Sequence, residues 1–160
     1  MSDKDREKLS RLFPKYFELF TLPEGAHEEK IKVYRACRTG KCDRQSFLPT
    51  YEQQGFSYTD RNDPEDPGVY SLSTFEKPNH VKNFAAMTSE FHVPYKIAIG
   101  DTEPRYGLVQ RTKERKPKSA SHVDWWLYEN AKPEEVFEII SDFEEHLAEY
   151  KRGRDNLNEK

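Results

Sequence analysis

Several polar side chains stand where the residue pattern predicts β-strands, and these are the side chains with the means to do chemistry. They are Arg35, Tyr70, Ser71, Ser73, His122 and Asp124. Side chains repeat every two residues along a strand, so His122 and Asp124 share one face, as do Ser71 and Ser73. We therefore expect a guanidinium, hydroxyls, an imidazole and a carboxylate to converge in one cleft.

Each of these residues also has an ordinary structural explanation. Arg35 can pair with a carboxylate on an edge strand, and Asp124 can cap a turn or lie at the solvent-facing end of its strand. An isolated histidine such as His122 is most often a satisfied structural group, and Tyr70 alone would be ordinary core. The order and spacing of the whole set, rather than any one member, favour the functional interpretation.

Short strands between helices have to position these residues. Alternating apolar residues predict strands at 31–36, 68–73, 95–99, 106–110 and 122–128. The pattern predicts helices over 3–20, from Pro78 through Met87, and over 133–150, with a kink near Phe13 or a new helix at Pro14. The tract 111–121 is expected to be an exposed loop. These elements indicate a mixed α+β fold.

Composition bounds the possibilities. A chain of 160 residues fits one domain, taken as 1–160, and its net charge of -3 offers no argument for nucleic acid or an anionic membrane. No apolar run reaches the ~18 residues that a spanning helix needs, and the charged N-terminus lacks a signal-peptide core, so we expect a cytoplasmic protein. Cys37 and Cys42 are too few for a zinc set, so two reduced thiols and no metal site are expected.

Three short islands resemble motifs of the ADP-ribosyltransferase superfamily, in that family's order and within residues 31–140. They are Val33-Tyr34-Arg35-Ala36-Cys37, then Gly68-Val69-Tyr70-Ser71 followed by Lys77, and Asp124-Trp125-Trp126-Leu127-Tyr128-Glu129-Asn130-Ala131-Lys132. The first is similar to a first strand whose histidine or arginine contacts NAD. The second is similar to the Gly-Ile-Tyr-Phe strand and downstream lysine of poly(ADP-ribose) polymerase catalytic domains. The third resembles the strand that carries the catalytic glutamate.

The resemblance implies a split mixed or antiparallel sheet with flanking N- and C-terminal helices, and a reaction in which NAD is the substrate. ADP-ribose would pass from nicotinamide to a macromolecular acceptor, either protein or nucleic acid, or to water. A carboxylate suits this reaction because positive charge develops on the ribose. The implied catalytic residues are Asp124, His122 and Tyr70, and the implied NAD-binding residues are Arg35, Ala36, Ser71, Ser73 and Lys77.

In these roles, Asp124 would stabilise the ribose cation, Tyr70 would stack on the nicotinamide, and His122 would act on the acceptor as base or hydrogen-bond donor. The basic tract before the last strand resembles, by position, the family's substrate-recognition loop. Its residues include Arg111, Lys113 and Arg115. A solvated loop without such a role is an equally ordinary explanation of that run.

Three departures from the family pattern support an alternative function. Asp124 stands where the family has glutamate, Pro78 replaces a small hydroxyl residue, and Val81 replaces a stacking aromatic. The alternative is a module on the same fold that binds a nucleotide or a macromolecule without turning NAD over. A third possibility is an interaction protein in which the aromatic strand is only core.

Overall fold

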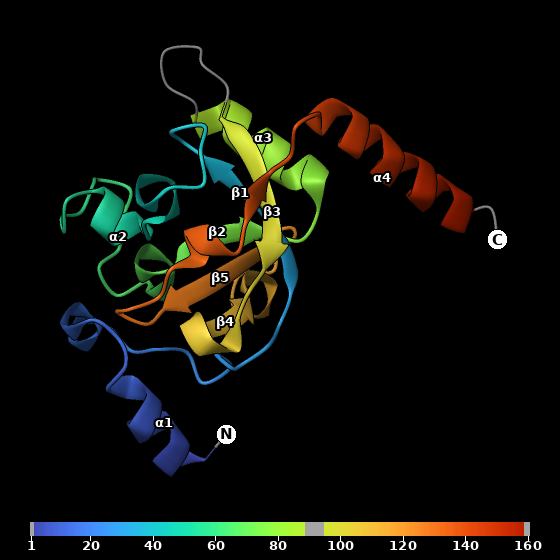
Figure 1. Ribbon diagram of the computed structural model, residues 1–160. Helices are drawn as coiled ribbons and strands as arrows, with labels where there is room; N and C mark the ends of the chain where they lie inside the picture. The colour runs from blue at the N-terminus through green and yellow to red at the C-terminus, as the bar shows by residue number, and fades with distance from the viewer. Residues whose placement is uncertain (1, 89–94, 159–160) are drawn as a thin grey trace.

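A single antiparallel sheet of six strands forms the centre of the protein in the computed structural model, which describes residues 2–88 and 95–158. The strand order is β4-β5-β2-β1-β3-β6 (Figure 1). The strands are β1 Lys32–Cys37, β2 Leu72–Phe75, β3 Lys96–Asp101, β4 Gly107–Arg111, β5 His122–Leu127 and β6 Glu138–Ile139. The expected mixture of helices and strands, an α+β class, is confirmed, and the sheet is antiparallel.

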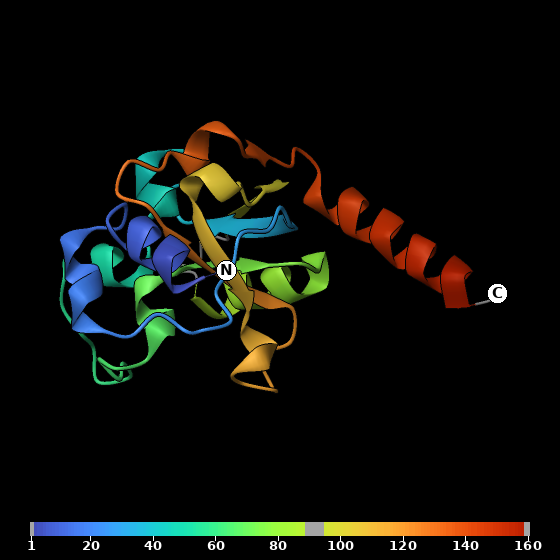
Figure 2. The same cartoon turned by 90° about the horizontal axis from the view of Figure 1, so that it is seen from below.

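Helices and short 3-10 segments surround this sheet. The α-helices in the described ranges are α1 Asp3–Ser10, α2 Thr50–Gln53, α3 Pro78–Thr88 and α4 Phe143–Asn158. The 3-10 segments are η1 Lys15–Leu19, η2 Arg44–Phe47, η3 Pro67–Tyr70, η4 Pro104–Tyr106, η5 Thr112–Glu114 and η6 Pro133–Glu135. Helix α4 projects away from the body in both views (Figures 1 and 2), and no described helix is long and apolar enough to cross a membrane.

The two faces of the sheet are covered differently. Val33, Leu72 and Trp125 pack on one face in a single cluster with Phe47 of η2. The other face carries two clusters. One surrounds Trp126 at the N-terminal segment, and the second joins β1, β2 and β3 to α3, with Phe75 among its members. The polar residues of β5 lie on this second face, between the two apolar clusters.

Strands β1 and β2 meet at a narrow seam. Among the described residues only Tyr34 and Phe75 are in register across it, whereas β1 and β3 pair along their whole length. At the seam, Arg35 Nη1 donates to the main-chain oxygen of Ser73 at 3.0 Å. The Arg35 side chain therefore supplies a hydrogen bond between β1 and β2 next to the one described position at which these strands are in register.

The N-terminal and C-terminal helices both differ from the sequence-based expectation. Helix α1 ends at Ser10, and a new 3-10 segment starts after Pro14, in agreement with the second of the two alternatives at that proline. The helix predicted over 133–150 is wrong in its first half. That stretch forms η6 and then β6, which pairs with β3, and α4 begins only at Phe143, where Asp142 accepts from the Glu145 amide at 3.1 Å.

Two further expectations need correction around the site. The strand predicted over 68–73 begins only at Leu72, because 67–70 form η3, in which the Gly68 amide donates to the side chain of Asp66. The tract 111–121 is not entirely an exposed loop, since Arg111 ends β4 and Thr112 is 5% exposed. The expected helix from Pro78 is confirmed, and it buries Val81 and Ala85.

Candidate functional site

A buried carboxylate, Asp124, is the centre of the polar cluster on β5. Its side chain is almost completely buried, and two hydroxyls donate to it: Ser71 Oγ to Oδ1 at 2.6 Å and Thr112 Oγ1 to Oδ2 at 2.7 Å. Hydrogen bonds from hydroxyls to an ionised oxygen are short and strong, as these distances are. The register between β2 and β5 sets this arrangement, because Ser73 lies opposite Asp124 and Ser71 precedes the strand on the same face.

Arg115 is the cationic member of the cluster and pairs with Asp124. Its Nη2 lies 2.9 Å from Asp124 Oδ2, its Nη1 donates to Gln110 Oε1 at 2.6 Å, and its guanidinium stands 5.5 Å over the Trp126 ring. The side chains of Arg115 and Asp124 are 18% and 1% exposed. The pair is thus largely removed from water, and the ion pair balances a charge that would otherwise be costly to bury.

His122 is joined to the carboxylate through Thr112. His122 Nδ1 lies 2.5 Å from Thr112 Oγ1, and the imidazole packs edge-on against Phe75 at 5.1 Å between centroids. Burial lowers the pKa of His122, and the nearby Asp124 carboxylate opposes that shift. The neutral imidazole is therefore the form that this position favours.

A cavity of about 470 Å³ opens above these residues. His122, Asp124, Thr112 and Phe75 line it, together with the basic residues Arg115, Lys116 and Lys118. Lys116 Nζ also bonds the rim carboxylate Asp66 at 2.6 Å. Ala120 borders the cavity with φ at 51°, a left-handed conformation that costs energy in a residue with a Cβ. The site combines hydroxyls, an imidazole and cations suited to an anionic, hydroxyl-rich ligand.

Arg35 does not join this cluster, contrary to expectation. Tyr34, Phe75 and His122 are in register across β1, β2 and β5 and share the face of Asp124, so Arg35 leaves the sheet on the opposite face. It is 7% exposed, and Nε and Nη1 donate to the main-chain oxygens of Ser46 and Ser73 at 2.9 and 3.0 Å. No carboxylate of the described segments forms an ion pair with it, and burial lowers its pKa to about 10.

Tyr70 is also held away from the cavity. It has no exposed surface, its ring stacks on Phe20 at 4.2 Å, and its hydroxyl donates to the main-chain oxygen of Pro64 at 2.6 Å. The hydroxyl is 2.8 Å from that of Tyr58, and burial together with this contact raises the pKa of Tyr70. Stacking of Tyr70 on a nicotinamide ring would require Phe20 to leave.

The remaining predicted NAD-binding residues are divided. Ser71 and Ser73 lie on the Asp124 face, and Ser71 contacts the carboxylate directly. Ala36 shares that face but is packed in the apolar cluster beside α3. Lys77 is exposed just before α3, where its amide nitrogen donates to Ser121 Oγ at 3.1 Å.

The predicted substrate loop is divided as well. Arg115 enters the cluster, and Lys113 is exposed on η5. Arg111 points to the other face of the sheet, where it forms ion pairs with Glu29 at 3.1 Å and Glu76 at 2.9 Å. These two pairs raise the pKa of Arg111. Only Arg115 of the three therefore meets the carboxylate.

Two members of the site, Thr112 and Gln110, were missed at the sequence level. Gln110 lies opposite Asp124 on β4, and Thr112 follows two residues later, so both reach the same side. Their polar side chains at i and i+2 beside a basic run were the available signal. Gly68, which the sequence places in a motif, also borders the site, because a Cβ there would lie 3.5 Å from Asp124 Oδ1 and 3.3 Å from Asp66 Oδ1.

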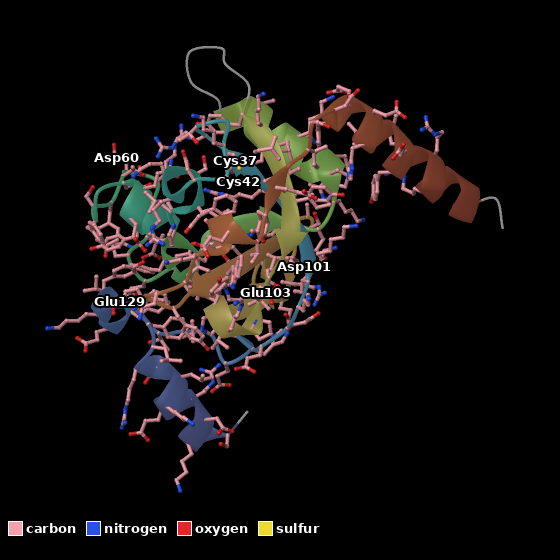
Figure 3. The ribbon with its side chains drawn as sticks, in the orientation of Figure 1. Cys37, Cys42, Asp60, Asp101, Glu103 and Glu129 are labelled. Atoms are coloured by element: carbon pink, nitrogen blue, oxygen red, sulfur yellow. The ribbon has the colours of Figure 1, made fainter. Side chains whose placement is uncertain are left out.

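The two cysteines lie outside this cavity, near the C-terminal end of β1 (Figure 3). Both are free thiols, Cys37 buried and Cys42 partly buried. Burial raises the pKa of Cys37 to about 12, so this thiol is unreactive at neutral pH.

Comparisons of the chain with family models, with curated proteins and with solved structures give no significant match.

Proposed function

We propose that the chain cleaves the nicotinamide–ribose bond of NAD in the cavity above Asp124 and transfers ADP-ribose to an acceptor. One observation carries the proposal: a carboxylate is fixed by two hydroxyls, Ser71 at 2.6 Å and Thr112 at 2.7 Å, at the floor of a cavity with cationic walls. The order of the three sequence islands adds support from a separate source.

The chemistry follows from the charge that the reaction creates. As the nicotinamide departs with the bonding electron pair, the ribose becomes an oxocarbenium-like cation. A carboxylate stabilises that cation strongly when it is already oriented and shielded from water. Ser71 and Thr112 do the orienting, so Asp124 does not need to reorganise during the reaction.

Arg115 has to exchange partners for NAD to reach the carboxylate. In the structure its guanidinium pairs with Asp124, and Lys116 and Lys118 also line the cavity. A guanidinium matches phosphate oxygens as well as carboxylate oxygens. On binding, Arg115 would turn to the pyrophosphate and leave the carboxylate free to meet the ribose.

The test measures nicotinamide release from NAD by the full chain and by two matched variants. Asp124→Asn keeps the side-chain volume and removes the charge, so release should fall by about 100-fold. Asp101→Asn is the control, because Asp101 ends β3, which β1 and β2 separate from β5 (Figure 3). Folding of both variants is checked by the fluorescence of the buried Trp125 and Trp126. Equal release by wild type and Asp124→Asn would refute the role given to the carboxylate.

A non-catalytic binding module is the second candidate, and the burial of Asp124 favours it. A carboxylate that already receives two hydroxyls and a guanidinium is satisfied without a substrate. In that case calorimetry would detect binding of NAD or ADP-ribose to the full chain with no nicotinamide released. Binding that Asp124→Asn leaves intact, with no turnover in wild type, would select this candidate.

A further inference from the structure

Two aromatic side chains lie exposed just after α2. Phe56 is 59% exposed and Tyr58 is 40% exposed, although burial of an aromatic ring is favourable. Both rings contact the buried ring of Tyr51, at 5.7 and 5.3 Å between centroids, and Phe56 also meets Tyr16 edge-on at 6.0 Å. These four side chains form one connected surface, which we call the aromatic patch.

The backbone conformation of Phe56 is also costly. Its φ is 60°, in the left-handed region, directly after Gly55 with a φ of 71°. The end of α2 needs only one such residue, and Gly55 supplies it. A glycine or an asparagine would adopt the conformation of Phe56 at a lower cost than phenylalanine does. The helix end explains why Phe56 contacts Tyr51, but it explains neither the left-handed backbone nor the exposed part of the ring.

The surroundings hold the patch in place. The hydroxyl of Tyr58 lies 2.8 Å from that of Tyr70. Gln54 Nε2 donates to the main-chain oxygen of Ser57 at 2.9 Å and to Asn62 Oδ1 at 2.7 Å, which ties the following loop to α2. A partner would therefore lose little free energy in ordering these side chains on binding.

A cavity of about 410 Å³ adjoins the patch. Phe56 and Tyr16 line it together with Pro49 and Leu127, so much of its wall is apolar. Its charged lining residues carry no net charge; they are Lys15, Arg44, Glu52 and Glu129. The cavity therefore suits an uncharged, apolar side chain of a partner.

The loop 57–66, which begins beside the patch, is acidic. Its exposed carboxylates are Asp60, Asp63 and Glu65, and none of the three forms an ion pair with another described residue. Arg61 is the one basic residue of this loop. The loop therefore attracts cations and repels nucleic acid and anionic membranes.

We propose that the aromatic patch and the loop 57–66 bind a basic peptide segment of a partner protein. An apolar side chain of that segment enters the cavity beside Phe56, and its arginine or lysine side chains lie over the exposed rings and the loop. A cation gains there from both the carboxylates and the faces of the aromatic rings. None of these residues lines the cavity above Asp124, so the proposal does not depend on NAD cleavage.

The first experiment selects a peptide without assuming its sequence. A phage library of short random peptides is selected on the full chain and then counter-selected on Phe56→Asn. We expect the enriched peptides to carry arginine or lysine on both sides of a large apolar residue. Enrichment of acidic peptides would overturn the proposal, and so would the failure to find any peptide that distinguishes the wild type from Phe56→Asn.

The second experiment measures the affinity of an enriched peptide by fluorescence anisotropy. Phe56→Asn should weaken binding by about 10-fold or more, and so should Asp60→Asn combined with Asp63→Asn. Affinity should also fall as the salt concentration rises. Asp101→Asn is the matched control, because Asp101 at the end of β3 lies well apart from Asp60 (Figure 3). An equal loss in the control would attribute the effect to net charge alone and overturn the proposal.

The third experiment separates binding from folding. Phe56→Asn relieves the left-handed strain, so its urea midpoint should not fall below that of the wild type. A lower midpoint with unchanged peptide affinity would assign Phe56 to the fold and overturn the proposal. Sedimentation of the full chain tests another occupant of the patch. A dimer that Phe56→Asn converts to monomer would show that a second copy covers the patch, which would overturn the assignment of a basic peptide.

Discussion

The ion pair between Arg115 and Asp124 should be one of the strongest side-chain interactions in the molecule. Its partners are 18% and 1% exposed, and removal of one member of a buried pair typically costs about 3–5 kcal/mol. Asp124 keeps Ser71 and Thr112 when Arg115 is removed, so Arg115→Met should fall near the lower limit, about 3 kcal/mol. Asp124→Asn should cost about 2 kcal/mol, because Arg115 can partly return to solvent.

The coupling between the two residues is measured by a double-mutant cycle. Urea unfolding of wild type, Arg115→Met, Asp124→Asn and the double variant is followed by tryptophan fluorescence. We expect the double variant to lose at least ~1.5 kcal/mol less than the sum of the single losses. The surface pair Lys82–Glu144, whose side chains are 46% and 73% exposed, is the control and should couple by less than ~1 kcal/mol. A coupling at Arg115–Asp124 no larger than that of the control would refute the reasoning.

Three other perturbations have expected outcomes that equilibrium unfolding can check. Arg35→Lys should lower the free energy of unfolding by about 2–4 kcal/mol, because one ammonium group cannot donate to the main-chain oxygens of both Ser46 and Ser73 as the planar guanidinium does. A loss below ~0.5 kcal/mol would contradict the importance of these two hydrogen bonds. Gly107→Ala should lower the free energy of unfolding by about 3 kcal/mol or more, because its Cβ would lie 2.0 Å from the Trp126 main-chain oxygen. Gly153→Ala is the matched comparison: its Cβ would meet nothing within 4 Å, so this change should stabilise α4 by ~0.5–1 kcal/mol. If Gly107→Ala unfolded at the wild-type urea midpoint, the close approach would be wrong. Burial lowers the pKa of His122 in the folded state, so the unfolded chain binds the proton at a higher pH, and the free energy of unfolding should fall as pH decreases through about 6.5. His122→Asn should show a shallower fall of this free energy between about pH 7.5 and 5. A pH dependence identical to that of wild type would contradict the lowered pKa of His122.

The core of the candidate site was predictable because it depends on local alternation. His122 and Asp124 two residues apart on one strand must share a face, and the same holds for Ser71 and Ser73. The grouping of Ser71 with Asp124 required only that two predicted strands pair. The structure confirms that grouping, with 2.6 Å between Ser71 Oγ and Asp124 Oδ1.

The placement of Arg35 depended on something that the sequence does not carry. Two strand pairings decide whether Arg35 lies on the same face as Asp124: Tyr34 lies opposite Phe75, and Phe75 lies opposite His122. A shift of one residue in either pairing would have moved Arg35 to the Asp124 face. Periodicity within a strand cannot fix such a shift.

The prediction of a helix over 133–150 was wrong in its first half for a related reason. The apolar residues of 133–150 fit a helical stripe, but Phe137 packs over Gly100, where a Cβ would lie 2.6 Å from its ring. That contact and the pairing of Ile139 with Ala98 hold the segment extended. Tertiary packing outweighed local propensity here, and only the part after Asp142 became helix.

The narrow seam between β1 and β2 makes Phe75 a point of mechanical contact between the two halves of the sheet. The residue pairs with Tyr34 on one side, and its ring forms a wall of the cavity on the other. A sheet bends with least cost in free energy where the fewest backbone hydrogen bonds join two strands, so bending should concentrate at the Tyr34–Phe75 pair. Any such bend would reposition the Phe75 ring against His122, and the width of the cavity would change in the same movement.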